Sequence, residues 1–174
     1  MFSGAEVHGS TLGIIGMGRI GQAIARRAAF GFGMPVVYHN RSRLDATVEA
    51  ECRAHYVDKE ELLRTADHVL LVVPYSAASH HTIGAPELAL MKPTATLINI
   101  ARGGIVDDVA LAAALRANRI AAAGLDVFEG EPTVHPDLLA CSNVVLTPHI
   151  ASATAGTRRA MAMLAVDNLI GYLV

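Results

Sequence analysis

Short apolar segments alternate along the chain with longer segments of helical periodicity. The short segments are rich in β-branched residues and most are apolar throughout, as strands buried on both faces must be. The longer segments are rich in alanine and repeat their apolar positions with helical spacing. This alternation predicts repeated βα units around a parallel sheet. The expected strands are Thr11–Ile15, Pro35–His39, Ala54–Val57, His68–Val73, Thr96–Asn99, Ala121–Asp126 and Val144–Leu146.

Helices are expected between these strands, and local chemistry marks several of their ends. Asp58 is suited to cap a helix with Glu60 and Glu61 in its first turn, because negative charge is favoured at that end of the helix dipole. Gly31 and Pro93 are suited to end the helices before them. We predict one α/β domain, a Rossmann-type doubly wound parallel sheet of about seven strands. The expected helices are Arg19–Phe30, Leu44–Cys52, Lys59–Thr65, Pro86–Met91, Asp107–Ala117 and a long one from about Thr154 to Leu173.

Charge and composition narrow the partners of this domain. The chain of 174 residues has 14 Lys plus Arg against 16 Asp plus Glu, which provides no field for gathering nucleic acid or anionic lipid. Apolar runs such as Ile120–Leu125 are far shorter than the roughly 20 residues of a membrane span, and the amino terminus has no secretory pattern. Cys52 and Cys141 read as reduced thiols. We expect no nucleic acid and no membrane partner, and a cytoplasmic location.

A glycine-rich loop follows the first expected strand and opens a helix. Its sequence Gly16-Met17-Gly18-Arg19-Ile20-Gly21 has the G-x-G-x-x-G spacing that cradles a dinucleotide pyrophosphate. Gly16 would make the tight turn, Gly18 would admit the phosphates, and Gly21 would let the helix pack closely on the strand. A glycine-rich turn without a ligand is the alternative for this motif alone.

The end of the second strand discriminates between dinucleotides. An NAD site normally carries an acidic residue there for the ribose 2′-hydroxyl, whereas this chain has Asn40, Arg41, Ser42 and Arg43. Arg41 and Ser42, with Arg43 as a further candidate, could donate hydrogen bonds to a 2′-phosphate, which a carboxylate would repel. The segment favours NADP(H) and leaves NAD(H) possible; a solvated basic turn is the alternative.

Three further loops carry polar groups to the same edge of the sheet. Arg102 follows the fifth strand, where it is suited to grip a carboxylate, although an ion pair to a neighbour would also explain it. Asp126 and Glu131 follow the sixth strand, and His149 follows the seventh. A lone histidine in a loop is more often a packing or surface residue, but here an acid, a carboxylate and an anion clamp converge beside a dinucleotide loop.

The four motifs, in this order, resemble the cofactor-binding domain of the D-isomer-specific 2-hydroxyacid dehydrogenases. The resemblance runs from about His8 to Leu173, and Asn40-Arg41-Ser42 is most similar to the NADPH-preferring glyoxylate, hydroxypyruvate and 2-ketogluconate reductases. The motifs are Gly16–Gly21, Ile98–Asp108, Gly124–Pro132 and Thr147–Ser152.

The resemblance implies a role for each polar residue. His149 would be the general acid that protonates a 2-oxo acid as hydride arrives from the nicotinamide, and Glu131 would orient it. Arg102 would bind the substrate carboxylate, and Asp126 would hold the nicotinamide carboxamide. Adjacent histidines at His80 and His81 lack further ligands at metal spacing, so no metal site is expected. The implied cofactor contacts are Gly16, Gly18, Arg19, Ile20, Gly21, Asn40, Arg41, Ser42, Val73, Pro74, Ser79, Thr82, Ile100, Ala101, Arg102, Asp126, His149 and Ser152.

The resemblance also implies that the chain is part of a larger enzyme. Family members are longer, because a second domain closes over the cofactor and supplies substrate contacts. Residues 1–174 are therefore expected to be an NAD(P)-binding domain without the substrate domain, inactive or weakly active alone, from a parent enzyme that is a homodimer. The alternatives are a corepressor-like module that senses dinucleotide without turnover, and a domain for another nucleotide cofactor. The latter would not explain Arg102, Glu131 and His149 together.

Overall fold

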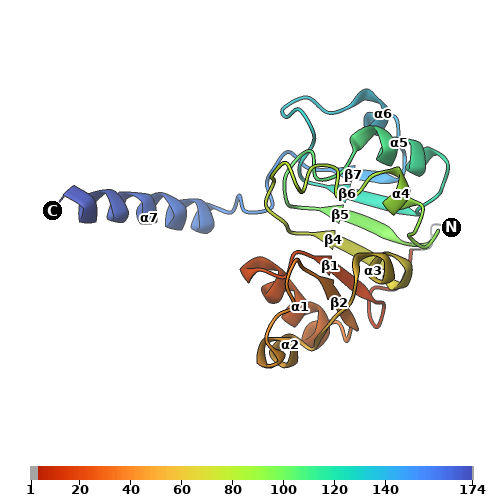
Figure 1. Cartoon of the computed structure of the whole chain (residues 1–174). Helices are drawn as coiled ribbons and strands as arrows, with labels where there is room; N and C mark the ends of the chain where they lie inside the picture. Colours follow the sequence, from red (N-terminus) through yellow and green to blue (C-terminus); the bar gives the residue numbers. More distant parts are fainter. Residues whose placement is uncertain (1–3, 174) are drawn as a thin grey trace.

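A computed structural model of the chain describes residues 4–173 (Figure 1). Seven strands form one sheet in the order β3-β2-β1-β4-β5-β6-β7, and every neighbouring pair is parallel. The order reverses direction between β1 and β4, which is the switch point at which doubly wound sheets bind ligands. The predicted Rossmann-type sheet is thus confirmed. The strands are β1 (Leu12–Ile15), β2 (Val36–His39), β3 (Ala54–Tyr56), β4 (His68–Leu71), β5 (Thr96–Asn99), β6 (Ala122–Leu125) and β7 (Val144–Leu146).

Six helices pack on the sheet and a seventh leaves it (Figure 1). Asp58 caps α3 through the Glu61 N–H at 2.7 Å, as its position before an acidic first turn predicts. Asp107 caps α5 in the same manner, accepting from the N–H groups of Val109 and Ala110. The helices are α1 (Arg19–Gly31), α2 (Ala46–Cys52), α3 (Lys59–Thr65), α4 (Ala85–Leu88), α5 (Asp108–Arg116), α6 (Pro136–Leu139) and α7 (Ala155–Leu173).

Two hydrophobic cores lie on the two faces of the sheet. Along β1, Leu12 and Ile14 belong to the core under α1 and α2, whereas Ile15 belongs to the core under α3, α4, α5 and α6. Successive side chains of a strand point to opposite faces, so an all-apolar strand serves both cores. Over β5, β6 and β7, the described helices cover only the second of these faces, and Val145 on the outer strand is 68% exposed.

The expected helix boundaries differ from the structure in several places. Gly31, expected to end the first helix, is its last residue and Phe32 caps it, and the helix expected over Asp107–Ala117 is Asp108–Arg116. The helix expected over Pro86–Met91 is the single turn α4, and the one expected from Leu44 begins at Ala46. The sequence analysis did not predict α6, which begins at Pro136 after the capping residue His135. Helices of four residues are too short to display a helical period, so only their capping residues can predict them from the sequence.

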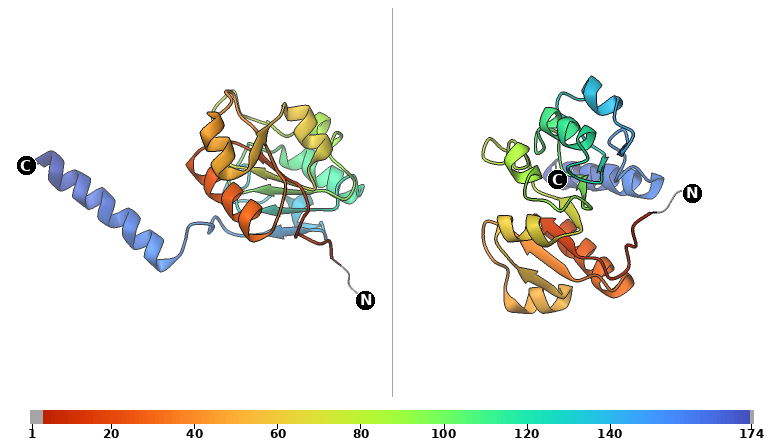
Figure 2. Two further views of the ribbon diagram at one scale, coloured as in Figure 1. Left: turned by 90° about the horizontal axis from the view of Figure 1, so that it is seen from below. Right: turned by 90° about the vertical axis from the view of Figure 1, so that its right-hand side faces the viewer.

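The last helix, α7, makes no packing contact with the sheet among the described residues. Figures 1 and 2 show it projecting from the body, and all of its described side chains are exposed, including Leu164 at 63% and Tyr172 at 88%. Within residues 4–173, no helix has both the length and the apolar character that crossing a bilayer requires. The long final helix expected from the sequence therefore forms, beginning at Ala155, but no described element covers it.

Candidate active site

A cleft of about 800 Å³ opens at the carboxyl ends of the strands. Because all seven strands run the same way, the loops that follow them meet at this edge of the sheet. The residues lining the cleft come from the first turn of α1 and from the loops after β4, β5, β6 and β7. They are Ile20, Val72, Val73, Pro74, Tyr75, Ile100, Ala101, Arg102, Gly103, Gly104, Phe128, Glu129, Gly130, Glu131 and His149.

The glycine loop has the backbone geometry that its sequence predicts. Gly16 has φ +103°, and a Cβ there would lie 2.7 Å from the Val72 carbonyl. At Gly21 a Cβ would lie 2.3 Å from the Gly16 oxygen, so this glycine brings α1 against the turn. Beside Gly18 no atom lies within 4 Å of a built Cβ, which leaves open space at the start of α1. The loop thus combines two enforced close contacts with one open position, as a phosphate cradle requires.

The segment after β2 separates its two arginines. Arg43 makes a two-pronged ion pair with Glu49, whose oxygens lie 2.8 and 2.9 Å from its nitrogens. Hydrogen bonds from Arg43 and from the Tyr38 hydroxyl outweigh burial and lower the pKa of Glu49 to about 2. Arg41 and Ser42 are exposed, and Arg41 has no ion pair among the described residues. Arg43 was predicted as a possible donor to a 2′-phosphate, but its guanidinium is bound to Glu49. Among the described residues of this turn, Arg41 is therefore the arginine without an ion pair.

Asn40 joins the second loop to the first. Its side-chain oxygen accepts a hydrogen bond from the Met17 N–H at 2.8 Å. The residue at the position of the usual NAD carboxylate thus holds the glycine loop in place.

An imidazole and a carboxylate pair at the cleft wall. The Nδ1 atom of His149 lies 2.9 Å from Oε2 of Glu131, and the proton in this contact belongs to Nδ1 because an ionised carboxylate only accepts. Burial by itself raises the pKa of Glu131, but hydrogen bonds from His149 and from the Phe128 N–H outweigh it and hold that pKa below its ordinary value. His149 has φ +53°, which turns the chain sharply at this residue. The ring is thus oriented through Nδ1, and Nε2 is the nitrogen left for a ligand.

Asp126 anchors the loop that carries His149. It is 5% exposed, and its carboxylate accepts hydrogen bonds from the Thr147 hydroxyl at 2.6 Å and from the N–H groups of Ile150 and Ala151 at 2.8 Å. Burial raises the pKa of Asp126, but these three hydrogen bonds outweigh it and lower that pKa. A buried charge held this way fixes the position of the loop after β7 relative to β6.

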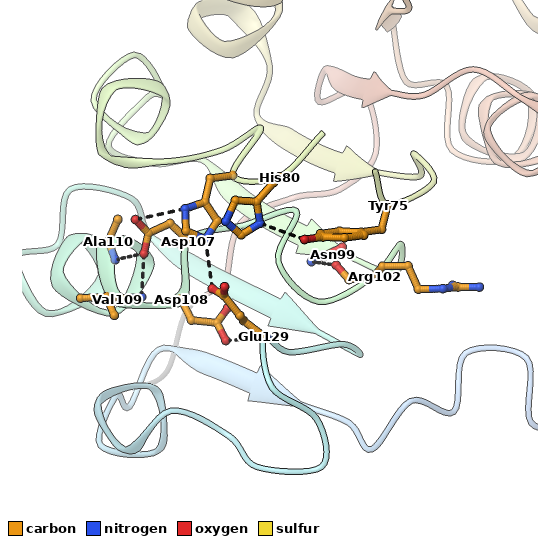
Figure 3. Close-up of polar contacts among 10 residues, drawn as sticks. Tyr75, His80, Asn99, Arg102, Asp107, Asp108, Val109, Ala110 and Glu129 are labelled. Atoms are coloured by element: carbon orange, nitrogen blue, oxygen red, sulfur yellow. Dashed lines mark hydrogen bonds and ion pairs between the residues drawn. The ribbon is translucent and has the colours of Figure 1, made fainter. Parts of the chain in front are cut away.

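Arg102 lies on a loop that the fold holds closely. The buried Asn99 side chain accepts from the Ala101 N–H at 3.0 Å and donates to the Arg102 carbonyl at 3.2 Å. A Cβ at Gly103 would collide with the Phe128 carbonyl, so the loops after β5 and β6 touch backbone to backbone. In Figure 3 the Arg102 side chain extends away from His80 and Glu129. Arg102 is exposed and lines the cleft that Glu131 and His149 also line.

Apart from Ser79 and Thr82, the predicted site residues fall into three groups in the structure. Ile20, Val73, Pro74, Ile100, Ala101, Arg102, Glu131 and His149 line the cleft. The rest of the glycine loop and the segment Asn40–Ser42 lie at the ends of β1 and β2, outside the lining but joined by the Asn40 hydrogen bond. Asp126 and Ser152 are outside the lining, the first beneath the His149 loop.

Ser79 and Thr82, predicted as cofactor contacts, use their hydroxyl groups in hydrogen bonds within their own loop. The Ser79 hydroxyl donates to the Pro74 carbonyl at 2.9 Å, and the Thr82 hydroxyl donates to the Ser79 carbonyl at 2.8 Å. Neither residue lines the cleft. Both hold the turn after β4.

Several lining residues were not predicted from the sequence. Tyr75 directly follows the predicted pair Val73 and Pro74, and Glu129 precedes Glu131 by two positions. The rule that ligands lie beyond the carboxyl ends of strands would have included both. The others are Val72, Gly103, Gly104, Phe128 and Gly130.

Comparisons with known proteins agree with this geometry. Residues 1–151 match the family model described as D-isomer specific 2-hydroxyacid dehydrogenase, NAD binding domain. A glyoxylate reductase of Thermococcus onnurineus is 54% identical over 172 residues, which are 99% of this chain and 51% of that protein. The chain thus spans about half the length of the curated relatives it matches.

Solved structures show the same likeness with either dinucleotide bound. The NADPH-dependent glyoxylate/hydroxypyruvate reductase of Sinorhizobium meliloti, in complex with NADP and malonate, is similar with a TM-score of 0.88 and 41% identity, over 95% of this chain and 50% of that one. The NAD complex of a D-isomer specific 2-hydroxyacid dehydrogenase from Lactobacillus delbrueckii has a TM-score of 0.86 and 31% identity, over 97% and 54%. The chain belongs to the D-isomer-specific 2-hydroxyacid dehydrogenase family and comprises its NAD-binding domain.

Proposed function

We propose that this chain is the cofactor-binding part of a reductase that transfers hydride from NAD(P)H to a small 2-oxo acid and forms the D-2-hydroxy acid. The observation that carries the proposal is the His149–Glu131 pair, 2.9 Å apart, in one cleft with Arg102. A proton donor and an anion clamp beside a dinucleotide loop are the groups that carbonyl reduction of an oxo acid needs. The glyoxylate and hydroxypyruvate reductases among the relatives support this substrate class.

The residues present fit a dinucleotide. Gly16 and Gly21 hold the turn so that the amino terminus of α1 faces the open space at Gly18, where phosphates would accept its N–H groups. Ile20, Val73, Pro74, Ile100 and Ala101 give the cleft apolar walls for the rings. When bound, the reduced nicotinamide supplies the hydride.

We further propose that NADP(H) is preferred over NAD(H). The turn after β2 has no carboxylate at Asn40, and Arg41 and Ser42 are exposed there. Arg43 is paired with Glu49, so Arg41 is the cation available to a 2′-phosphate. The relative from S. meliloti, which is NADPH-dependent, supports this preference.

Each polar residue then has a defined task. The proton held at Nε2 of His149 passes to the carbonyl oxygen of the substrate, while Glu131 keeps its bond to Nδ1 and stabilises the charged ring. Arg102 binds the carboxylate of the oxo acid and polarises the carbonyl beside it. Asp126 lies beneath the His149 loop and outside the cleft lining, so in this proposal it acts by fixing that loop through its three hydrogen bonds and not by contacting the nicotinamide carboxamide.

Turnover depends, in this proposal, on the half of the relatives' length that the chain does not span. The described cleft is open to solvent, and hydride transfer benefits from a closed, water-free site. We therefore expect residues 1–174 alone to bind dinucleotide and to turn over slowly or not at all. The homodimer implied by the family resemblance stays a prediction.

The decisive experiment compares binding with turnover. NADPH and NADH are titrated into the chain by fluorescence, and a form that includes the substrate domain is given NADPH with glyoxylate or hydroxypyruvate. We expect tighter binding of NADPH, oxidation of NADPH with both acids, and D-glycerate from hydroxypyruvate, identified by chiral chromatography. Binding without oxidation of NADPH for any 2-oxo acid would replace the reductase by the corepressor-like alternative, which no relative reported above supports.

A further inference from the structure

A second polar cluster lies beside the cleft, outside the groups used for carbonyl reduction. His80 and His81 sit in the turn after β4, and Glu129 sits in the loop after β6. One ligand atom of each residue lies within 4.8 Å of the other two, and Figure 3 shows Glu129 brought beside the histidine turn. Sequence spacing argued against a metal here because no third ligand lies nearby along the chain. The fold supplies that ligand from 48 residues away.

From this cluster we infer a site for a zinc ion, or a divalent ion of similar preference, bound by the two imidazoles and the Glu129 carboxylate. Two nitrogens and one oxygen form a donor set that Zn²⁺ accepts, with water completing a tetrahedron. Donors bound to one tetrahedral Zn²⁺ at about 2.0–2.1 Å lie about 3.3 Å apart. The His81 Nε2 and the Glu129 Oε2 atoms are 3.0 Å apart, so this pair needs to separate only slightly.

In both histidines the Nδ1 atom has a neighbour on the protein, so Nε2 is the nitrogen that would bind the ion. The Nδ1 atom of His80 faces the Tyr75 hydroxyl at 3.3 Å, and the Nδ1 atom of His81 lies 3.9 Å from the Asp107 carboxylate. Contacts of this type to the far nitrogen orient metal-binding histidines and choose their tautomer. The two rings stack with centroids 3.8 Å apart and an interplanar angle of 22°, which keeps both imidazoles beside Glu129.

The backbone beneath the cluster is held in position. The His81 N–H donates to the Gly104 carbonyl at 2.8 Å, and the Glu129 N–H donates to the Asp108 carboxylate at 3.0 Å. His81 has φ +50°, a conformation that few side chains adopt and that presents its ring to Glu129. Both halves of the site are thus fastened to the segment from Gly104 to Asp108, where α5 begins, and the exposed surface gives an ion access.

The ion would join two loops that border the proposed active site. Tyr75 and Glu129 line the cleft, and Glu129 is two residues from Glu131. Zinc bound here would cross-link the loop after β4 to the loop after β6. This inference concerns the rim alone and does not depend on the reaction proposed for the cleft.

The test is titration of the purified chain with Zn²⁺ by calorimetry, and with Co²⁺ by visible absorption, without nucleotide. We expect one ion per chain and no thiolate charge-transfer band. Glu129→Gln and His81→Asn, which suits the positive φ, should each weaken Zn²⁺ binding by about 100-fold or more, and Tyr75→Phe by about tenfold. His55→Gln removes an exposed histidine from β3 and should leave binding unchanged.

The His149–Glu131 pair is the competing zinc ligand, and His149→Gln distinguishes it. Zinc binding that survives His149→Gln, together with slower amide hydrogen exchange in residues 76–82 and 127–131, supports the rim site. No uptake by the unaltered chain, uptake unaffected by Glu129→Gln, or uptake lost in His149→Gln would each overturn it. Circular dichroism of every variant checks that the fold is retained.

Discussion

The loops after β1 and β2 differ from the loops after β5, β6 and β7 in how they present groups to a ligand. The first region depends on glycines, which have no side chain. Gly16 and Gly21 permit close backbone contacts, and Gly18 leaves open space. The second region works by placing charged side chains, since Arg102, Glu131 and His149 line one cleft. Steric sites fail when atoms are added, whereas charged sites fail when a proton or a charge is removed.

The two regions also differ in how they are held. The glycine loop lies between β1 and α1, within one continuous βα unit. One side-chain hydrogen bond, from the Met17 N–H to Asn40, joins it to the loop after β2. The His149 loop depends on Asp126 and Glu131, which come from a different strand. The first region should therefore tolerate distant changes that displace the second. Substitutions in each region test this difference.

The largest expected effect is on turnover in the second region. Replacing His149 by glutamine removes the proton donor but keeps a polar side chain, so kcat should fall about 10²- to 10⁴-fold. NADPH affinity should be largely kept, because we propose that the phosphates bind at the glycine loop after β1. Kinetics of the form with the substrate domain and fluorescence titration measure the two quantities, with His55→Gln as the control. Near-normal kcat would remove His149 from its proposed role.

Alanine substitutions at Gly21 and Gly18 test the steric requirement of the loop after β1. The Gly21→Ala methyl would lie 2.3 Å from the Gly16 oxygen, so overpacking should cost about 1–3 kcal/mol of unfolding free energy and also weaken NADPH binding. Gly18→Ala meets no atom within 4 Å, so its stability should change by less than about 0.5 kcal/mol while NADPH binding still weakens. Urea denaturation and NADPH titration separate the two. If Gly18→Ala binds NADPH normally, its open space does not receive the phosphates.

A smaller effect is expected for the dinucleotide preference. Arg41→Ala should weaken NADPH binding by about tenfold and leave NADH binding unchanged, because one charge-assisted hydrogen bond to the 2′-phosphate is lost. Arg27→Ala, an exposed arginine bonded only within α1, is the matched control. An equal loss for both dinucleotides would show that Arg41 acts on the fold and not on the phosphate.

The smallest expected effect is the pH dependence of stability at the turn after β2. Arg43 and Tyr38 lower the pKa of Glu49 from 4.5 to about 2, so the contribution of Glu49 is fully present above pH 4.5 and is lost as the pH falls through about 2. The difference in unfolding free energy between the unaltered chain and Glu49→Gln should shrink across this window. Glu51→Gln, an exposed carboxylate on the same helix, controls for loss of a charge. A difference independent of pH would contradict the ion pair.

Much of the fold was predictable because its signals are local. The succession of strands and long helices along the chain, the cap at Asp58 and the G-x-G-x-x-G turn each depend on residues within a few positions of one another. The brief helix α6 gave no periodic signal. The sequence also did not show that Arg43 forms an ion pair while Arg41 does not, because Glu49 approaches Arg43 only when α2 packs beside β2.

The sequence by itself determined the alternating βα pattern, the glycine turn and the family to which the chain belongs, because these depend on residue types in order along the backbone. The family resemblance already implied that Glu131 meets His149, but only the tertiary structure decided that Asp126 holds the loop after β7 and that Glu129 meets His81. It also left α7 without a covering element among the described residues. Helix formation is a local property, whereas pairing and packing depend on distances in space that only the folded sheet establishes.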